Sequence, residues 1–178
     1  MIAAVVISSA AVNAERVSPE QKNDQAYLAV VSALNTADDL VKANGSICDV
    51  RIEVSGGTVT TTTAGSDGLG LGQWATVQVG RMENGGIAEP KNVVVSASDM
   101  GNANVPDVLL TFTMTTDRSI YVRACQDVWG SSTVPTDETT LKADLAERGL
   151  FGYTLNRQVA SSGSSGTTVF WDAVEVNV

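Results

Sequence analysis

The sequence predicts an α+β protein in which a long N-terminal α-helix packs on an antiparallel β-sheet. Three observations carry this prediction. The first 14 residues contain no charged side chain, residues 18–43 repeat apolar side chains at steps of three and four, and from residue 47 apolar and polar residues alternate. Steps of three and four indicate a helix, whereas alternation is typical of strands. We therefore divide the chain into an N-terminal helix, 1–43, and a β-rich head domain, 44–178.

The arm at residues 1–14 is apolar but short. Its uninterrupted apolar part covers residues 1–7, and residues 10–12 extend it. A membrane-spanning helix needs about 20 such residues. Three interpretations are open. The arm is a signal peptide cleaved after Ala14, although no basic residue precedes it, or a buried strand or helix of a globular core, or the C-terminal part of a longer apolar helix.

Residues 18–43 form the clearest predicted helix. Ser18 suits the N-cap, Pro19 the first helical position, and Asn44-Gly45 the end of the helix. Pro19 allows either a fresh start at Ser18 or a kink in one helix of about 65 Å that begins at residue 1 and would need a partner. The apolar stripe that we expect to pack on the sheet comprises Tyr27, Val30, Val31, Leu34, Ala37, Leu40 and Val41.

Short runs rich in Val, Ile and Thr predict the strands of the head domain. Gly56-Gly57 and Asp117-Arg118 predict hairpins between neighbouring runs. In the second hairpin, leucine, phenylalanine and methionine alternate with threonine, which predicts one buried and one solvated face. The predicted strands are 48–54, 58–63, 74–79, 92–97, 108–115, 119–126, 152–159 and 167–178.

Two further segments lie between the late strands. A short helix is predicted over residues 137–148, because Leu141 and Leu145 are four residues apart and Gly149 follows as a stop. Residues 161–166 read SSGSSG, a composition typical of an exposed, flexible loop.

The composition excludes several classes of function. The chain has 11 Lys and Arg against 20 Asp and Glu, a net charge of −9, and no histidine. Nucleic-acid binding requires clustered cations, and Ser–His, Cys–His and His-ligated zinc sites require histidine. The paired carboxylates of a glycosidase would need aromatic platforms that three Trp, three Tyr and three Phe do not supply in a fold of this size. We expect no enzyme, no cofactor and no nucleic-acid partner.

One loop gathers four oxygen-bearing side chains, those of Asp99, Asn102, Asn104 and Asp107. Calcium prefers carboxylate and amide oxygens, so this loop is a candidate calcium site. Its spacing does not match an EF-hand, and loops rich in Asp and Asn usually form turns. We therefore interpret the loop as a turn and expect no metal.

The two cysteines, Cys48 and Cys125, fall in separate predicted strands. In an exported protein we expect them to form one disulfide, which would stabilise the fold by about 4 kcal/mol. In a reducing compartment they would be two buried thiols. We expect the disulfide if the protein is exported.

The chain resembles type IV pilins and pseudopilins, most of all the pilin-like proteins of Gram-positive anaerobes. The residues that carry this likeness are MIAAVVISSAAVNA, which lead through a polar stretch into the helix SPEQKNDQAYLAVVSALNTADDLVKA. The predicted hairpin 109–122 and the closing strands 170–178 look like the C-terminal sheet of that group. The chain departs from pilins in two ways, because it has Val5 where pilins carry a glutamate and it shows no glycine-containing cleavage motif with a basic leader.

The resemblance implies a structural subunit of a filament that contains copies of this chain or related pilins. The arm would lie in the membrane before assembly and in the filament core afterwards, while the head domain would face the cell exterior. The charged residues Glu15, Arg16 and Glu20 would set the axial register between neighbours. The assembling side chains of the arm would be Ile2, Val5, Val6, Ile7 and Val12.

The alternative is a secreted or surface-displayed β-rich binding domain, such as an adhesin module. In that case residues 1–14 would be the remnant of a signal sequence.

Overall fold

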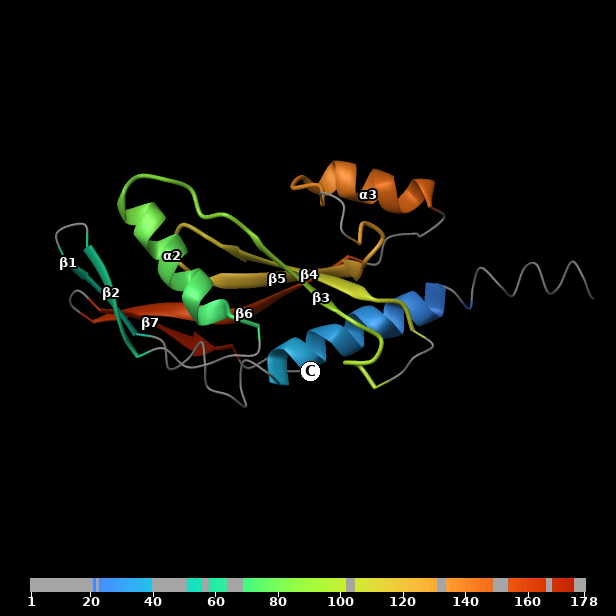
Figure 1. Cartoon of the computed structure of the whole chain (residues 1–178), viewed down its shortest axis with the longest axis horizontal. Coiled ribbons are helices and arrows are strands. Elements are labelled where there is room, and N and C mark those ends of the chain that lie inside the picture. The colour runs from blue at the N-terminus through green and yellow to red at the C-terminus, as the bar shows by residue number, and fades with distance from the viewer. Residues whose placement is uncertain are drawn as a thin grey trace, which may run out of the picture.

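The computed structural model describes residues 21, 23–39, 51–55, 58–63, 69–101, 105–130, 134–148, 154–165 and 168–174. Figure 1 shows an elongated molecule built around one β-sheet, with helices on both of its faces. The sheet has seven strands in the order β2-β1-β7-β6-β5-β4-β3. Every neighbouring pair is antiparallel, which confirms the α+β class.

The described helices and strands follow one another along the chain in a simple order. A helix over residues 23–39 comes first, and residue 21 is helical as well. The remaining elements are β1 (Arg51–Ser55), β2 (Thr58–Thr63), α2 (Leu71–Glu83), β3 (Lys91–Val95), β4 (Val108–Met114), β5 (Ile120–Gln126), α3 (Glu138–Glu147), β6 (Leu155–Ser165) and β7 (Thr168–Ala173).

Two apolar clusters occupy the two faces of the sheet. The larger one joins the N-terminal helix and α2 to side chains such as Leu110, Phe112 and Trp171. The smaller one joins Leu141 and Leu145 of α3 to the opposite face. Along β4, Val108, Leu110, Phe112 and Met114 belong to the larger cluster, while Leu109 faces the smaller cluster on the other side.

The prediction of a strand over 74–79 is wrong, because this segment lies inside α2. Thr76 and Val77 are β-branched and suggested a strand, yet the buried residues recur at helical spacing through Trp74 and Gln78. The Trp74 Nε1 donates to the Glu89 carbonyl at 2.9 Å. The Gln78 Oε1 accepts from the Glu89 amide at 2.7 Å, so this buried polar side chain is satisfied only when the segment is helical.

The prediction of a loop over 161–166 is also wrong for its described part. Residues 161–165 continue β6 and pair with β7. Gly163 is required in this hairpin, because a Cβ at this position would lie 2.6 Å from the ring of Phe170. The serines here form a strand because the β7 backbone supplies their hydrogen-bond partners, which composition alone does not reveal.

Other predictions are confirmed. The hairpin at Asp117-Arg118 joins β4 and β5, and β1 pairs with β2 as expected around Gly56-Gly57. The short helix predicted over 137–148 is α3, and Asp137 is its N-cap, accepting from the Thr140 amide at 2.7 Å. The strand predicted over 92–97 is β3, shifted by one residue at its start.

Candidate functional site

The N-terminal helix buries one face against the sheet. Of the stripe predicted for this contact, Val30, Leu34 and Ala37 are buried in the larger cluster, and Val31 is half-buried. Leu40 and Val41 lie outside the described residues. The buried residues of the described helix are Ala26, Ala29, Val30, Ala33, Leu34 and Ala37.

The expectation for Tyr27 is wrong. Its side chain is 44% exposed, and the neighbouring Leu28 is 61% exposed. The buried face also includes Ala26, Ala29 and Ala33, which the predicted stripe did not contain, so the face is centred away from Tyr27. The outer side of the helix therefore carries two adjacent large apolar side chains, which we call the Tyr27–Leu28 patch.

A polar contact holds the helix to the middle of the sheet. The Arg157 Nη1 on β6 pairs with the Asp38 carboxylate at 2.5 Å and donates to the Asn35 Oδ1 at 3.3 Å. The Asp38 and Asn35 side chains lie three residues apart, on the same side of the helix. This contact and the buried apolar face both hold the helix on the sheet in one orientation, with Tyr27 and Leu28 exposed.

The described helix begins at one end of the long axis of the molecule (Figure 1). The predicted assembly residues of the arm, Ile2, Val5, Val6, Ile7 and Val12, lie outside the described residues, as do Glu15, Arg16 and Glu20. Among the residues that the structure does describe, no helix combines the length and apolar character needed to cross a membrane.

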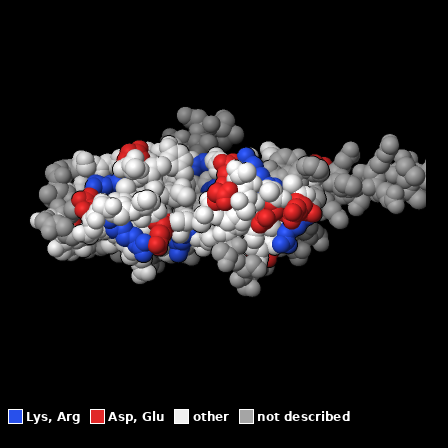
Figure 2. All heavy atoms as spheres, turned by 90° about the horizontal axis from the view of Figure 1, so that it is seen from above, with Lys and Arg blue, Asp and Glu red and all other residues white. Residues whose placement is uncertain are grey.

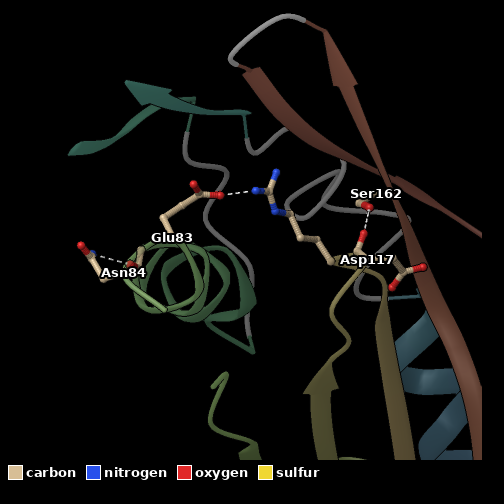
Figure 3. A network of polar contacts seen from close by, with 6 residues as sticks. Glu83, Asn84, Asp117 and Ser162 are labelled. Carbon is tan, nitrogen blue, oxygen red and sulfur yellow. Dashed lines mark hydrogen bonds and ion pairs between the residues drawn. The ribbon is translucent and has the colours of Figure 1, made fainter. Parts of the chain in front are cut away.

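The turn between β4 and β5 connects three parts of the fold (Figure 3). Arg118 pairs with Glu83 at the end of α2, and the Ser162 hydroxyl of β6 donates to the Asp117 carbonyl. The Arg118 carbonyl accepts from the Trp171 Nε1 of β7 at 2.7 Å. Arg118 has a φ of 66°, a left-handed conformation that these contacts on three sides maintain.

The Asp117 carboxylate is fully engaged within the same turn. It accepts from the Thr115 and Ser119 hydroxyls and from the Ser119 amide, and these bonds lower the pKa of the carboxyl, the Thr115 bond most of all. A cavity of about 290 Å³ lies beside the turn. Because the charged groups of the turn already have partners, we interpret it as a structural joint of the fold.

The expected disulfide is absent from the structure. Cys125 is a buried free thiol, packed with Leu109 and Trp129 beneath α3. Burial raises the pKa of this thiol to about 11. Its side chain points into the smaller cluster, where α3 rather than a second cysteine fills the space, and Cys48 lies outside the described residues.

The described part of the candidate calcium loop forms a turn. The Asp99 carboxylate accepts from the Ser96 amide at 3.0 Å and from its hydroxyl at 2.6 Å, and these bonds lower the pKa of Asp99. The Asp107 Oδ1 accepts from the Ala97 amide at 2.9 Å. Asn102 and Asn104 lie outside the described residues. Among those described, no group of three or more acidic or cysteine side chains could hold a metal.

A cavity that the sequence pattern does not predict lies on the α3 side of the sheet. The β4–β5 register pairs Thr111 with Arg123, on the same face as Leu109 and Cys125, which α3 covers. Beside α3 this face hollows into a cavity of about 220 Å³. The cavity is lined by Pro90, Asn92, Thr111, Thr113, Arg123, Val134, Pro135 and Thr136.

The alternating pattern of the strands predicts only one wall of this cavity. Threonines alternating with apolar residues predicted a solvated second face, yet Thr111 on that face is buried. The loop that forms the far wall, Val134 to Thr136, comes after β5, and nothing in the strand pattern predicts where it folds back.

The charged side chains on the face seen in Figure 2 are of both signs and lie close together. Over α3, for example, Lys142 pairs with Glu138 at 2.7 Å. The described surface on this face therefore presents no basic patch of the kind that nucleic-acid binding requires.

No protein-family model, no curated protein and no solved structure matches this chain.

Proposed function

We propose that this protein is a structural subunit of a type IV pilus-like or pseudopilus-like filament and that it assembles through its N-terminal helix. The observation that carries the proposal is the Tyr27–Leu28 patch. It lies on the outer side of a helix that is held on the sheet, and the uncharged segment 1–14 precedes this helix in the sequence.

The distribution of charge and apolar surface supports this proposal. All charged side chains follow residue 14, whereas the arm carries none. Burying apolar surface contributes about 25 cal/mol per Å² removed from water, so an exposed apolar arm favours association. The helix begins at one end of the molecule, which leaves the space beyond that end for neighbouring copies.

The proposal places the head domain at the cell exterior and the arm in the membrane before assembly. Its partners are copies of this chain or related pilins. In this arrangement the arms associate first, and the Tyr27–Leu28 patch extends the contact along each helix. The mechanism is assembly, and we propose no catalytic step.

Sedimentation of the full chain after removal of detergent tests the proposal. We expect the parent chain to form large assemblies, Val6→Asp to abolish them and Leu28→Asp to weaken them. Burying an unpaired carboxylate at an apolar contact is strongly unfavourable. The matched control is Ile87→Asp, because Ile87 is 88% exposed and lies after α2, away from the N-terminal helix. Assemblies that are unchanged in both Val6→Asp and Leu28→Asp would contradict the proposal.

A second candidate function is a secreted or surface-displayed β-rich binding domain. One observation favours it, namely the cavity lined in part by Arg123, which the assembly proposal does not use.

A further inference from the structure

The cavity on the α3 side of the sheet is built from three separate parts of the chain. Thr111, Thr113 and Arg123 form its floor on β4 and β5. Asn92 on the neighbouring β3 extends the floor, since it pairs with Thr111. Val134, Pro135 and Thr136 supply the opposite wall. Pro135 and Pro90, which also lines the cavity, restrict the backbone at these two places.

Arg123 is the charged group of this cavity. Its Nε is buried, and no hydrogen-bond partner for it is found in the structure. A buried donor without a partner costs the full desolvation of that group, and the cost is larger when the group is charged. Arg123 as a whole is half-buried and lines the cavity, so an acceptor in the cavity could approach its guanidinium and offset part of this cost.

Glu138, the acidic residue whose pKa Arg123 affects, has another ion-pair partner. Glu138 begins α3, and its carboxylate pairs with Lys142 at 2.7 Å. Lys142 has the largest effect in lowering the pKa of Glu138, and Arg123 has the smallest of the lowering effects. Arg123 therefore influences Glu138 through space, while the described ion pair of Glu138 is with lysine.

The other polar groups of the lining are neutral. The Thr111 hydroxyl donates to the Asn92 Oδ1 at 2.9 Å, which fixes the amide so that its NH₂ group is the side that remains to donate. Thr113 and Thr136 add hydroxyl groups. The lining holds one cation and no carboxylate, so its electrostatic preference is for an anion with a single charge.

We propose that this cavity binds the carboxylate group of a small molecule through the guanidinium of Arg123, with Asn92, Thr113 and Thr136 as neutral hydrogen-bond partners. The planar fork of an arginine matches a carboxylate with two parallel hydrogen bonds. A phosphate monoester carries a charge near −2 at neutral pH, which one guanidinium in a chain of net charge −9 does not balance. This proposal does not depend on filament assembly.

The carboxylate could belong to a simple organic acid or to an acidic sugar. Tyr121 is exposed and pairs with Thr113, so an aromatic ring lies in the row next to the cavity. Such a ring offers an apolar surface to the body of a larger ligand. Acetate and glucuronate distinguish the two sources, since only glucuronate carries a sugar ring that could reach Tyr121.

Amide chemical shifts of the full chain, recorded during titration with acetate, glucuronate, glucose and inorganic phosphate, test the proposal. We expect saturable shifts around residues 111, 113 and 123 with acetate and glucuronate, and none with glucose. Tighter binding of glucuronate than of acetate would assign an acidic sugar, and equal binding a simple organic acid. The absence of saturable shifts with both carboxylates, or tighter binding of phosphate, would overturn the proposal.

Variants of Arg123 distinguish binding at this cavity from a general effect of the protein's positive charges. Arg123→Gln should weaken carboxylate binding by about tenfold or more, and Arg123→Lys should weaken it less, because the charge remains while the fork is lost. Arg81→Gln is the matched control, since Arg81 is exposed and pairs with Glu89 outside the cavity. Equal binding by Arg123→Gln and Arg81→Gln would overturn the proposal.

A second variant covers the case in which Arg123→Gln does not fold. Thr113 is an exposed strand residue that lines the cavity, so Thr113→Phe should fill the cavity without disturbing the core. We expect this variant to lose carboxylate binding while its tryptophan fluorescence stays that of the parent. Undiminished binding by folded Thr113→Phe would overturn the proposal.

Discussion

The guanidinium of Arg157 on β6 lies against the carboxylate of Asp38 on the N-terminal helix, 119 positions away in the sequence. The two side chains are only 24% and 12% exposed. β6 is the middle strand of the sheet, so this pair joins the helix to the centre of the fold. The same helix carries the Tyr27–Leu28 patch on its exposed side.

Replacing Arg157 with methionine should destabilise the protein, because it leaves the Asp38 carboxylate largely buried without its partner. Removing one partner of an exposed ion pair costs little, and removing one partner of a buried pair costs more. For this partly buried pair we expect the free energy of unfolding to fall by about 1–3 kcal/mol. Urea unfolding followed by tryptophan fluorescence measures it. Lys142→Met is the control, because its pair with Glu138 is more than half exposed. Equal losses in the two variants would show that burial of the Arg157 pair does not matter.

Gly163→Ala should destabilise the β6–β7 hairpin. The added Cβ would lie 2.6 Å from the Phe170 ring, so the ring or the strand must move. Overpacking of this kind typically costs about 1–3 kcal/mol, measured as a lower free energy of unfolding. Adding Phe170→Leu should recover part of the loss, since it removes the atoms that collide. A double variant as unstable as the sum of the single ones would contradict this explanation.

The Cys125 thiol should be unreactive in the folded protein. It is buried under α3, and its pKa of about 11 keeps it protonated at pH 8. In a Cys48→Ser variant, a thiol-specific reagent such as DTNB should react only after urea is added. Rapid reaction without urea would show that α3 opens readily or that the thiol is not buried.

The same thiol should make stability depend on alkaline pH. Its pKa is raised from 9.0 to about 11 in the folded state, so its contribution is complete below pH 9 and is lost as the pH rises towards 11. Relative to Cys125→Ala, the native protein should lose up to about 2–3 kcal/mol between pH 8 and pH 11. Unfolding curves of both proteins at the two pH values measure this difference. A difference that is constant with pH would contradict the raised pKa.

Asp137 should stabilise α3 through its charge as well as its hydrogen bond. Its bond from the Thr140 amide lowers the pKa of the carboxyl, so this stabilisation is present above the ordinary pKa and is lost as the pH falls through the lowered value. Asp137→Ala should melt at a lower temperature than the parent at pH 7, and Asp137→Asn, which keeps the cap, should lie between them. The differences should shrink at pH 2. Differences that persist unchanged at pH 2 would exclude the charge as their cause.

The strongest predictions from sequence concern elements whose signals are local. The β4–β5 hairpin follows from alternation around Asp117-Arg118, and α3 follows from Asp137 as a cap with Leu141 and Leu145 on one face. In each case the residues that define the element are neighbours in the chain. Their spacing therefore contains the information that the fold uses.

The α2 helix, the continuation of β6 through its serines and the cavity beside Arg123 were decided by tertiary contacts. Gln78 lies in a helix whose position lets its Oε1 accept from the Glu89 backbone amide, and Gly163 lies in a strand where the Phe170 ring occupies the space above it. The sequence by itself determined an acidic α+β protein with a charge-free N-terminal arm and an antiparallel sheet. Only the tertiary structure decided that Tyr27 faces outward, that Cys125 is a free thiol and that Thr111, Arg123 and residues 134–136 enclose one cavity. Such decisions depend on which distant groups satisfy a buried polar atom or fill a space, and spacing along the chain does not specify those partners.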